Sequence, residues 1–255
     1  MKRMVSIAAP ILLIAVLLAA WEAACRLWAV PTFILPPPSD VVIAARDNFD
    51  ILASSAWNTL RVAIIAWIAA SLIAGAIALA VSLHWAVEDA VRPLAVILQV
   101  TPIVAIAPLV NIWAGLDHPE RGVVALAIVV AFFPIFSGAL TGLKSADPDL
   151  ERLFDLYGAD RVQRLLRLRL PSAVPFILQG LKVAAGLALV GAVVAEYVAG
   201  SGGAQGLAWR ILEAQHRLQT AKMLAALLVL AAMAVTLYSG LQLGEQAILR
   251  RWRGR

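Results

Sequence analysis

The side chains that could carry out chemistry are few in this sequence of 255 residues. Three histidines, His84, His118 and His216, fall in three different connections between apolar runs, and the chain has one cysteine, Cys25. A metal centre or an activated nucleophile needs several such groups close together. We therefore expect neither a metal site nor a catalytic set, which disfavours a membrane-embedded enzyme.

Two ionisable side chains, Lys182 and Glu196, fall within one apolar run. A lone charge near the centre of a bilayer costs a few kcal/mol, so each calls for an explanation. Lys182 lies about two helical turns from one end of the run and could reach the interface. Glu196, beside Tyr197, could line the mouth of a transport pathway, pair with a cation or simply reach water.

A second set of polar side chains, Gln99, Thr101 and Asn111, flanks two prolines, Pro102 and Pro108. Prolines free backbone carbonyls, which membranes tolerate where neighbours or a water-filled cavity satisfy them. This pattern favours a kinked helix lining a pathway. Hydrogen bonding between helices by Thr101 and Asn111 explains the same residues equally well.

Long apolar runs must position these groups, since 62% of the residues are hydrophobic and 15% charged. The mean hydropathy is +0.87, and about 20 apolar residues cross a bilayer as a helix. We predict an all-α, polytopic membrane bundle that forms one transmembrane domain over residues 1–255. Its six expected transmembrane helices cover about 5–24, 62–83, 94–116, 123–143, 174–199 and 221–243.

The distribution of basic residues predicts the orientation. The net charge is +5, and most Lys and Arg fall in the terminal segments and in alternate connections, which the positive-inside rule places in the cytoplasm. Both termini are therefore expected there. No basic stripe interleaved with aromatic residues is present, so a nucleic-acid partner is not expected.

The long cytoplasmic connection, residues 144–171, has the pattern of a short helix followed by a sharp turn. Asp147 is a plausible N-cap with Pro148 in the first helical position. An apolar stripe then follows at helical spacing, consisting of Leu150, Leu153, Phe154 and Tyr157. Gly158 stands where a left-handed residue would end the helix.

A second short helix can follow Gly158, with its apolar residues on one side, until Leu170-Pro171 breaks it at the membrane. The connection is thus predicted to be a helix-turn-helix on the inner surface. Its exposed apolar stripe beside charges suits the docking of a cytosolic protein. A helix that merely rests on lipid headgroups is the alternative.

The spacing of Gly158, nine residues, Leu168, one residue and Leu170-Pro171 resembles the motif E-A-A-x3-G-x9-I-x-L-P. That motif belongs to the inner-membrane permease subunits of binding-protein-dependent ABC importers. The resemblance extends over nearly the whole chain and is strongest to the nitrate, sulfonate, taurine and pyrimidine-precursor branch. It includes the Leu-Pro-Pro-Pro-Ser lead-in at 35–39, Thr101-Pro102 through Ala107-Pro108, and Val194-Ala195-Glu196. The E-A-A triplet aligns with Arg152-Leu153-Phe154, so the glutamate that commonly contacts the ATPase is absent.

The resemblance implies a permease that moves a small polar organic solute or anion into the bacterial cytoplasm by alternating access. A sulfonate, taurine, nitrate and a pyrimidine are the solutes it suggests. The implied partners are two copies of an ATP-binding subunit, a second copy of this chain, and a periplasmic or lipid-anchored substrate-binding protein. No cofactor would bind here directly, since ATP and Mg would bind to the ATPase. The chain indeed contains no G-x-x-x-x-G-K-[S/T] phosphate loop.

By the same resemblance, the contact with the ATPase would fall on the helix-turn-helix of the inner membrane surface. The implied residues are Arg152, Leu153, Phe154, Tyr157, Gly158, Ala159, Asp160, Arg161 and Pro171. The main alternative is an ion- or proton-coupled secondary transporter, which needs ionisable pairs inside the membrane. Only Lys182 and Glu196 qualify, and they lie well apart on the same predicted helix.

Overall fold

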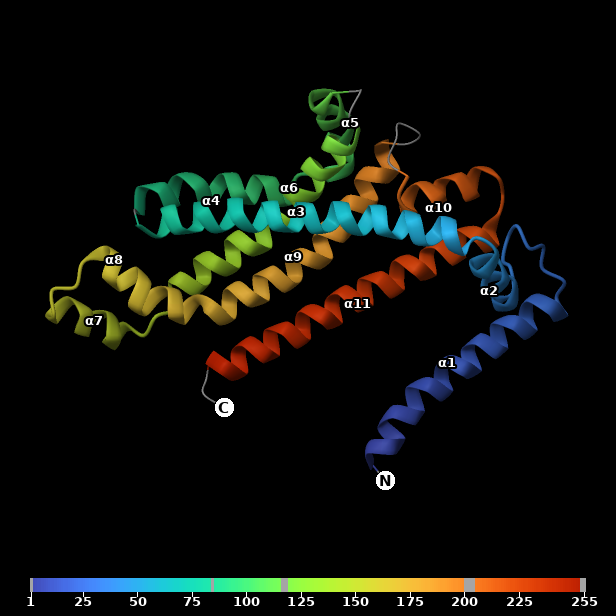
Figure 1. Cartoon of the computed structure of the whole chain (residues 1–255), viewed down its shortest axis with the longest axis horizontal. Helices are drawn as coiled ribbons and strands as arrows, with labels where there is room; N and C mark the ends of the chain where they lie inside the picture. The colour runs from blue at the N-terminus through green and yellow to red at the C-terminus, as the bar shows by residue number, and fades with distance from the viewer. Residues whose placement is uncertain (1, 84, 116–118, 200–204, 253–255) are drawn as a thin grey trace. The chain divides into compact units, whose positions relative to one another are not determined.

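A computed structural model describes residues 2–83, 85–115, 119–199 and 205–252, and within these ranges the chain is helical and contains no strand (Figure 1). Expectations that involve His84, His118, residue 116 or the side chain of Gln99 lie outside what the structure describes. The helices are α1 (Lys2–Leu27), α2 (Pro38–Asp47), α3 (Phe49–Leu83), α4 (Trp85–Val100), α5 (Ile103–Ala114), α6 (Pro119–Leu143), α7 (Pro148–Leu156), α8 (Arg161–Arg164), the π-helical segment η1 (Leu165–Arg169), α9 (Leu170–Ala199), α10 (Leu207–His216) and α11 (Thr220–Trp252).

Four helices in the described ranges are long and apolar enough to cross a membrane. They are Phe49–Leu83, Glu120–Leu143, Arg161–Ala199 and Thr220–Trp252, and they contain the second, fourth, fifth and sixth predicted spans. The protein is therefore an integral membrane protein. A shorter apolar helix, Ile103–Ala114, covers part of the third predicted span.

The third predicted span, 94–116, is interrupted near Pro102, where a kink was expected: α4 ends at Val100 and α5 begins at Ile103. Pro102 between them has an extended backbone, with φ −69° and ψ 107°. A proline lacks the amide hydrogen that would continue the helix, and it disfavours helical geometry in the residue before it. Pro108, by contrast, lies inside α5 without ending it.

The chain divides into two compact units, residues 1–57 with 205–231, and residues 58–204 with 232–255. In the first unit, α1 and α2 are joined through Glu22. Its carboxylate accepts hydrogen bonds from the Ser39 amide at 3.0 Å and from the Ser39 hydroxyl at 2.9 Å. In α10 of the same unit, Arg210 donates to Glu213 at 2.9 Å and to the buried hydroxyl of Ser55 at 3.0 Å.

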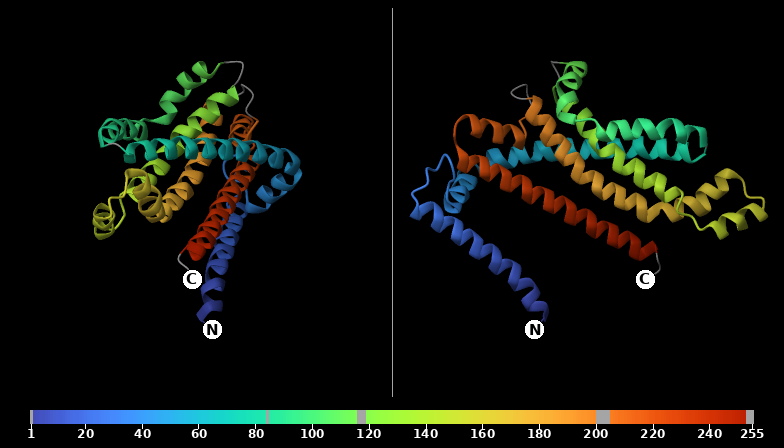
Figure 2. Two further views of the ribbon diagram at one scale, coloured as in Figure 1. Left: turned by 60° about the vertical axis from the view of Figure 1, so that its left-hand side comes forward. Right: turned by 180° about the vertical axis from the view of Figure 1, so that it is seen from behind.

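The second unit is built around α6 and α9, which run beside each other (Figure 2). Small residues allow this close approach. A Cβ atom on Gly180 of α9 would lie 2.7 Å from the Pro134 carbonyl of α6, and one on Gly142 would lie 2.9 Å from Ala173. Dispersion contacts between closely packed backbones drive helix association in lipid, where the hydrophobic effect is absent.

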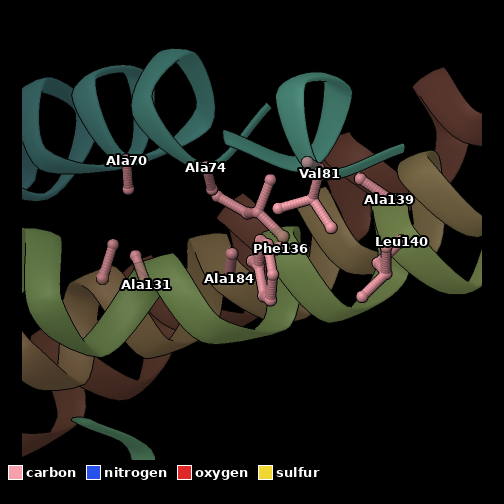
Figure 3. Packing of buried hydrophobic residues seen from close by; sticks show 11 residues of the cluster. Ala70, Ala74, Val81, Ala131, Phe136, Ala139, Leu140 and Ala184 are labelled. Atoms are coloured by element: carbon pink, nitrogen blue, oxygen red, sulfur yellow. The ribbon is translucent and has the colours of Figure 1, made fainter. Parts of the chain in front are cut away.

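Alanines continue this packing onto the part of α3 that belongs to the same unit. Ala70 and Ala74 of α3 face Ala131 of α6 and Ala184 of α9, and all four are fully buried (Figure 3). The result is a closely packed three-helix core from which α7 and α8 extend.

Candidate functional site

The helix predicted after Asp147 is present as α7. The Asp147 side chain accepts a hydrogen bond from the Asp149 amide at 2.8 Å, and Pro148 occupies the first helical position. A carboxylate at this point satisfies an amide that the helix leaves free and interacts favourably with the helix dipole. The predicted start of the helix is thus confirmed.

Gly158 ends this helix in the predicted left-handed conformation, with φ +65°. Its amide donates to the Asp155 carbonyl at 3.0 Å, and the Ala159 amide donates to the Phe154 carbonyl at 3.0 Å. These two bonds form a Schellman motif. No atom lies within 4 Å of where a Cβ would stand, so the backbone conformation alone favours glycine here.

The next helix begins with a capping box that we did not predict. Asp160 accepts a hydrogen bond from the Gln163 amide at 2.7 Å, and the Gln163 side chain accepts one from the Asp160 amide at 3.3 Å. The spacing of Asp160 and Gln163 is itself a capping-box signal that could have been found in the sequence. The turn between α7 and α8 is therefore fixed from both sides.

The helix begun at Asp160 does not break at Leu170-Pro171, so that prediction is wrong. It continues from Arg161 to Ala199 through the π-helical segment η1, in which the Leu170 amide bonds to the Leu165 carbonyl. The wider turn shifts the hydrogen-bond register just before Pro171, and the Ser172 hydroxyl donates to the Leu168 carbonyl at 2.9 Å. Such local adjustments accommodate a proline within a helix.

Ion pairs brace α7 against the start of the long helix, and sequence reasoning missed them. Glu151 accepts from Arg169 at 2.7 Å and lies 3.3 Å from an Arg164 nitrogen, and Arg164 also pairs with Asp155. The side chains of Glu151 and Arg164 are each 21% exposed. Opposite charges on two adjacent helices were the available signal, but sequence does not fix the angle between those helices.

No residue of α7 is buried. The side of this helix that faces away from the ion pairs is therefore uncovered. Leu156 and Tyr157 are 84% and 83% exposed, and Leu150 and Leu153 are nearly half exposed. Leu156 was not part of the predicted apolar stripe, but the left-handed turn that follows leaves it uncovered. An apolar surface of this kind can bind a protein partner.

The structure brings most of the residues predicted to contact an ATPase together on α7, the turn and α8 (Figure 1). Arg152 is exposed and pairs with Asp149 at 3.0 Å, and Arg161 is exposed at the start of α8. Pro171 lies apart from this group, within α9. The residues that gather are Arg152, Leu153, Phe154, Tyr157, Gly158, Ala159, Asp160 and Arg161.

The predicted pathway residues other than Gln99 have different immediate contacts. Glu196 is 1% exposed and accepts hydrogen bonds of 2.9 and 3.1 Å from Thr59 of α3, whereas the adjacent Tyr197 is 47% exposed. The Thr101 hydroxyl donates to the Ile97 carbonyl at 2.6 Å, in the break between α4 and α5. Asn111 packs closely against α6, where a Cβ on Gly122 would lie 2.1 Å from its side-chain oxygen.

Lys182 has a partner that the sequence did not reveal. Its ammonium nitrogen lies 2.5 Å from Glu245 and 5.9 Å from the centre of the Tyr238 ring. Glu245 fell beyond the predicted sixth span, 221–243, but α11 extends to Trp252. The pair joins α9 to α11, and both side chains are largely buried.

Within the described residues, no group of three or more His, Cys, Asp or Glu is placed to hold a metal ion. Several charged groups instead brace helices, and Leu156 and Tyr157 are strongly exposed apolar side chains at the end of α7.

Comparisons with known proteins agree with this description. The family model described as "Binding-protein-dependent transport system inner membrane component" matches residues 68–254. A formylaminopyrimidine transport permease protein, ThiX, from Halalkalibacterium halodurans is 34% identical over 205 residues, which cover 80% of each chain. The taurine transport system permease protein TauC of Escherichia coli is 30% identical over 94% of this chain and 88% of its own. A probable ABC transporter permease protein of Haemophilus influenzae is 30% identical over 90% of this chain and 91% of its own.

Proposed function

Because the chain belongs to the family of binding-protein-dependent inner membrane transport components, we propose that it is the solute-conducting subunit of an ATP-driven importer in the bacterial inner membrane. It is a permease of the ABC importer type. Permeases of this family work with an ATPase and a substrate-binding protein. In our proposal two copies of this chain pair with two copies of the ATPase, which binds ATP and Mg, and both termini are cytoplasmic.

The proposed bundle crosses the membrane six times. Four crossings are α3, α6, the helix Arg161–Ala199 and α11, which have the necessary length and apolar composition. The remaining two are α1 and the broken pair of α4 and α5. A broken helix is tolerated within a membrane where it is covered by protein or lines a cavity.

We propose that α7 and the turn at Gly158 form the coupling element that docks into the ATPase. The exposure of Leu156 and Tyr157, at the end of a helix braced on its other side by Arg164 and Arg169, carries this proposal. Apolar anchors supply affinity and surrounding charges supply orientation. The ion pairs would pass a displacement of α7 to the base of α9, since they join the two directly.

Closure of the two ATPase subunits on ATP would then move the paired α7 helices and shift the bundle between inward-open and outward-open states. ATP can bias this equilibrium only through its different affinity for the two states. The packed α6 and α9 would move together as one body. The proposed pathway residues are Gln99, Thr101, Asn111, Glu196 and Tyr197.

The proposed cargo is a small polar organic molecule or anion. This rests on relatives that are named for transport of formylaminopyrimidine and taurine. Taurine and formylaminopyrimidine are therefore the first two probes to use, with nitrate and an alkyl sulfonate next.

Uptake into vesicles tests the proposal. The chain is reconstituted with its ATPase and its substrate-binding protein, and uptake of labelled probe is measured with and without ATP. We expect uptake to require ATP and all three proteins, and to persist when a protonophore removes the proton gradient. Uptake by this chain alone, driven by a proton or sodium gradient, would refute the proposal.

One observation favours the second candidate, a secondary transporter, because Lys182 and Glu245 form an ionisable pair within apolar helices. A Lys182→Met variant distinguishes the two. An ion-coupled carrier that uses this pair would lose its dependence on the ion gradient. The proposed importer would remain ATP-driven in this variant.

A further inference from the structure

Two adjoining pockets lie between the end of α3 and the start of the helix Arg161–Ala199. The first, of about 270 Å³, is lined by Ser82 and by three arginines, Arg161, Arg164 and Arg169. The second, of about 520 Å³, shares Ser82 and Arg169 and also includes Lys144 and Glu151. The groove is therefore lined by four basic side chains, one carboxylate and one serine.

The position of this groove across the membrane follows from the helices that form it. The apolar run of α3 ends at Leu83, and the apolar part of the other helix begins at Leu170, directly after Arg169. In Figure 1 this end of α3 lies at the same end of the second unit as α8. The groove thus stands where apolar helix surface gives way to basic residues, which is the depth of lipid headgroups.

The arginines are oriented but not neutralised. Glu151 pairs with both Arg164 and Arg169, and Asp155 pairs with Arg164. These ion pairs hold the two guanidinium groups at the groove. The Arg164 Nε atom is buried without a hydrogen-bond partner in the described part of the chain. Arg161 has no carboxylate partner there, so the three arginines exceed the two carboxylates in charge. Guanidinium groups arranged in this way match the oxygens of a phosphate.

Apolar side chains accompany these arginines. Leu83 lines the groove and is 42% exposed, and Val162 and Leu166, which lie between Arg161 and Arg169 along the chain, are 57% and 58% exposed. Exposed leucine and valine beside a phosphate site offer a surface for acyl chains. A free anion would make no use of this surface.

We propose that the groove binds the phosphodiester headgroup of an anionic phospholipid, such as phosphatidylglycerol, from the cytoplasmic leaflet. Basic pockets between transmembrane helices on this side of a membrane are suited to such headgroups. The bound lipid would sit against the braced base of α7 and would stabilise the coupling element in its docked orientation. The inference rests on the membrane orientation given in the proposed function.

Lipid retention by the purified full-length chain tests the proposal. The chain in detergent is mixed with equal amounts of phosphatidylglycerol and phosphatidylcholine that carry the same acyl chains, and retained lipid is identified by native mass spectrometry. We expect the wild type to prefer phosphatidylglycerol. Arg161→Gln and Arg169→Gln should each reduce that preference about fivefold, the effect of removing one basic residue at a membrane surface.

Arg46→Gln is the matched control, since Arg46 is an exposed arginine on α2, in the other unit. It should leave the preference unchanged. If Arg169→Gln does not remain monodisperse on size exclusion, Arg161→Gln decides the result, because Arg161 forms no ion pair with the residues that the structure describes. Equal retention of both lipids by the wild type would overturn the proposal, as would an unchanged preference in Arg161→Gln.

Two further measurements test whether the groove binds a free anion or the ATPase instead of a lipid. Inorganic phosphate in excess should not displace the lipid, and displacement would mean that the site takes a free anion instead. If Arg161→Gln retains the lipid preference but loses binding to the ATPase, the groove belongs to the protein interface and the proposal is overturned.

Failure of the lipid site can be separated from failure of the proposed function, because the lipid assay contains no ATPase and no substrate. Orientation is tested separately with a Gln163→Cys variant made in a Cys25→Ala chain. Labelling from the cytoplasmic side together with no lipid preference would overturn only the lipid site. Labelling from the periplasmic side would overturn the proposed orientation itself.

Discussion

Replacing Gly158 with valine should uncouple the permease from its ATPase while leaving the membrane bundle intact. A side chain in the left-handed conformation costs about 1–2 kcal/mol, and a β-branched one is a stronger outlier. The Schellman turn at Gly158 is closed by two hydrogen bonds, Gly158 to Asp155 and Ala159 to Phe154. Each contributes about 0.5–1.5 kcal/mol, so the penalty is comparable with what holds the turn.

A change of this size alters a local equilibrium by a factor of about 5–30, and stimulation of ATPase activity by the loaded binding protein should fall accordingly. No atom lies within 4 Å of the added Cβ, so the bundle itself should be unaffected. Gly158→Asn is the matched control, because asparagine tolerates this conformation, and it should retain most of the stimulation. Wild-type stimulation in a correctly assembled Gly158→Val importer would refute the reasoning.

Three other predictions concern the bundle and the first unit. Lys182→Met and Glu245→Leu should each lower the unfolding temperature in detergent by several degrees, because each leaves a charge without its partner; the double variant should recover most of the loss, and additive losses would contradict a direct pair. Gly180→Ala should cost about 1–3 kcal/mol through overpacking against Pro134, whereas Gly186→Ala, with nothing within 4 Å, should not destabilise the protein; equal effects in thermal unfolding would contradict the packing. A hydrogen bond from Arg210 lowers the pKa of Glu213 below its usual 4.5. The ionised Glu213 therefore stabilises the fold above pH 4.5, and this stabilisation is lost as the pH falls through the lowered pKa. Glu213→Gln should show a smaller acid-induced loss of stability than the wild type.

The apolar helices and the helix ends were predictable because their signals are local. Runs of apolar residues indicate α3, α6, α9 and α11, since the bilayer sets their length. The cap at Asp147 and the left-handed Gly158 depend only on residues within a few positions, and both were predicted correctly.

The error in the helix boundaries concerns a proline. Pro102 interrupts the third predicted span, where a kink was expected, but Pro171 lies inside a continuous helix. The difference at Pro171 is the π-helical turn before it, which moves the hydrogen bonds that a proline would disrupt. No feature of the sequence around Pro171 announces that turn.

The missed contacts join residues distant along the chain. Glu151 meets Arg169 across a helical hairpin, and Lys182 meets Glu245 from another helix. Each depends on how helices pack, so charge type alone could not identify the partner. Glu151 directly precedes Arg152, the first residue of the aligned triplet. Its carboxylate forms ion pairs with arginines of this chain.

The coupling role of α7 is tested most directly by photo-crosslinking in the assembled importer. A photoreactive residue replaces Leu156, which is 84% exposed, or Arg46 on α2 as the control. We predict that position 156 captures the ATPase subunit in membranes and that position 46 does not. An assembled, ATP-hydrolysing importer in which position 156 reaches no ATPase, or is modified only from the periplasmic side, would contradict the account.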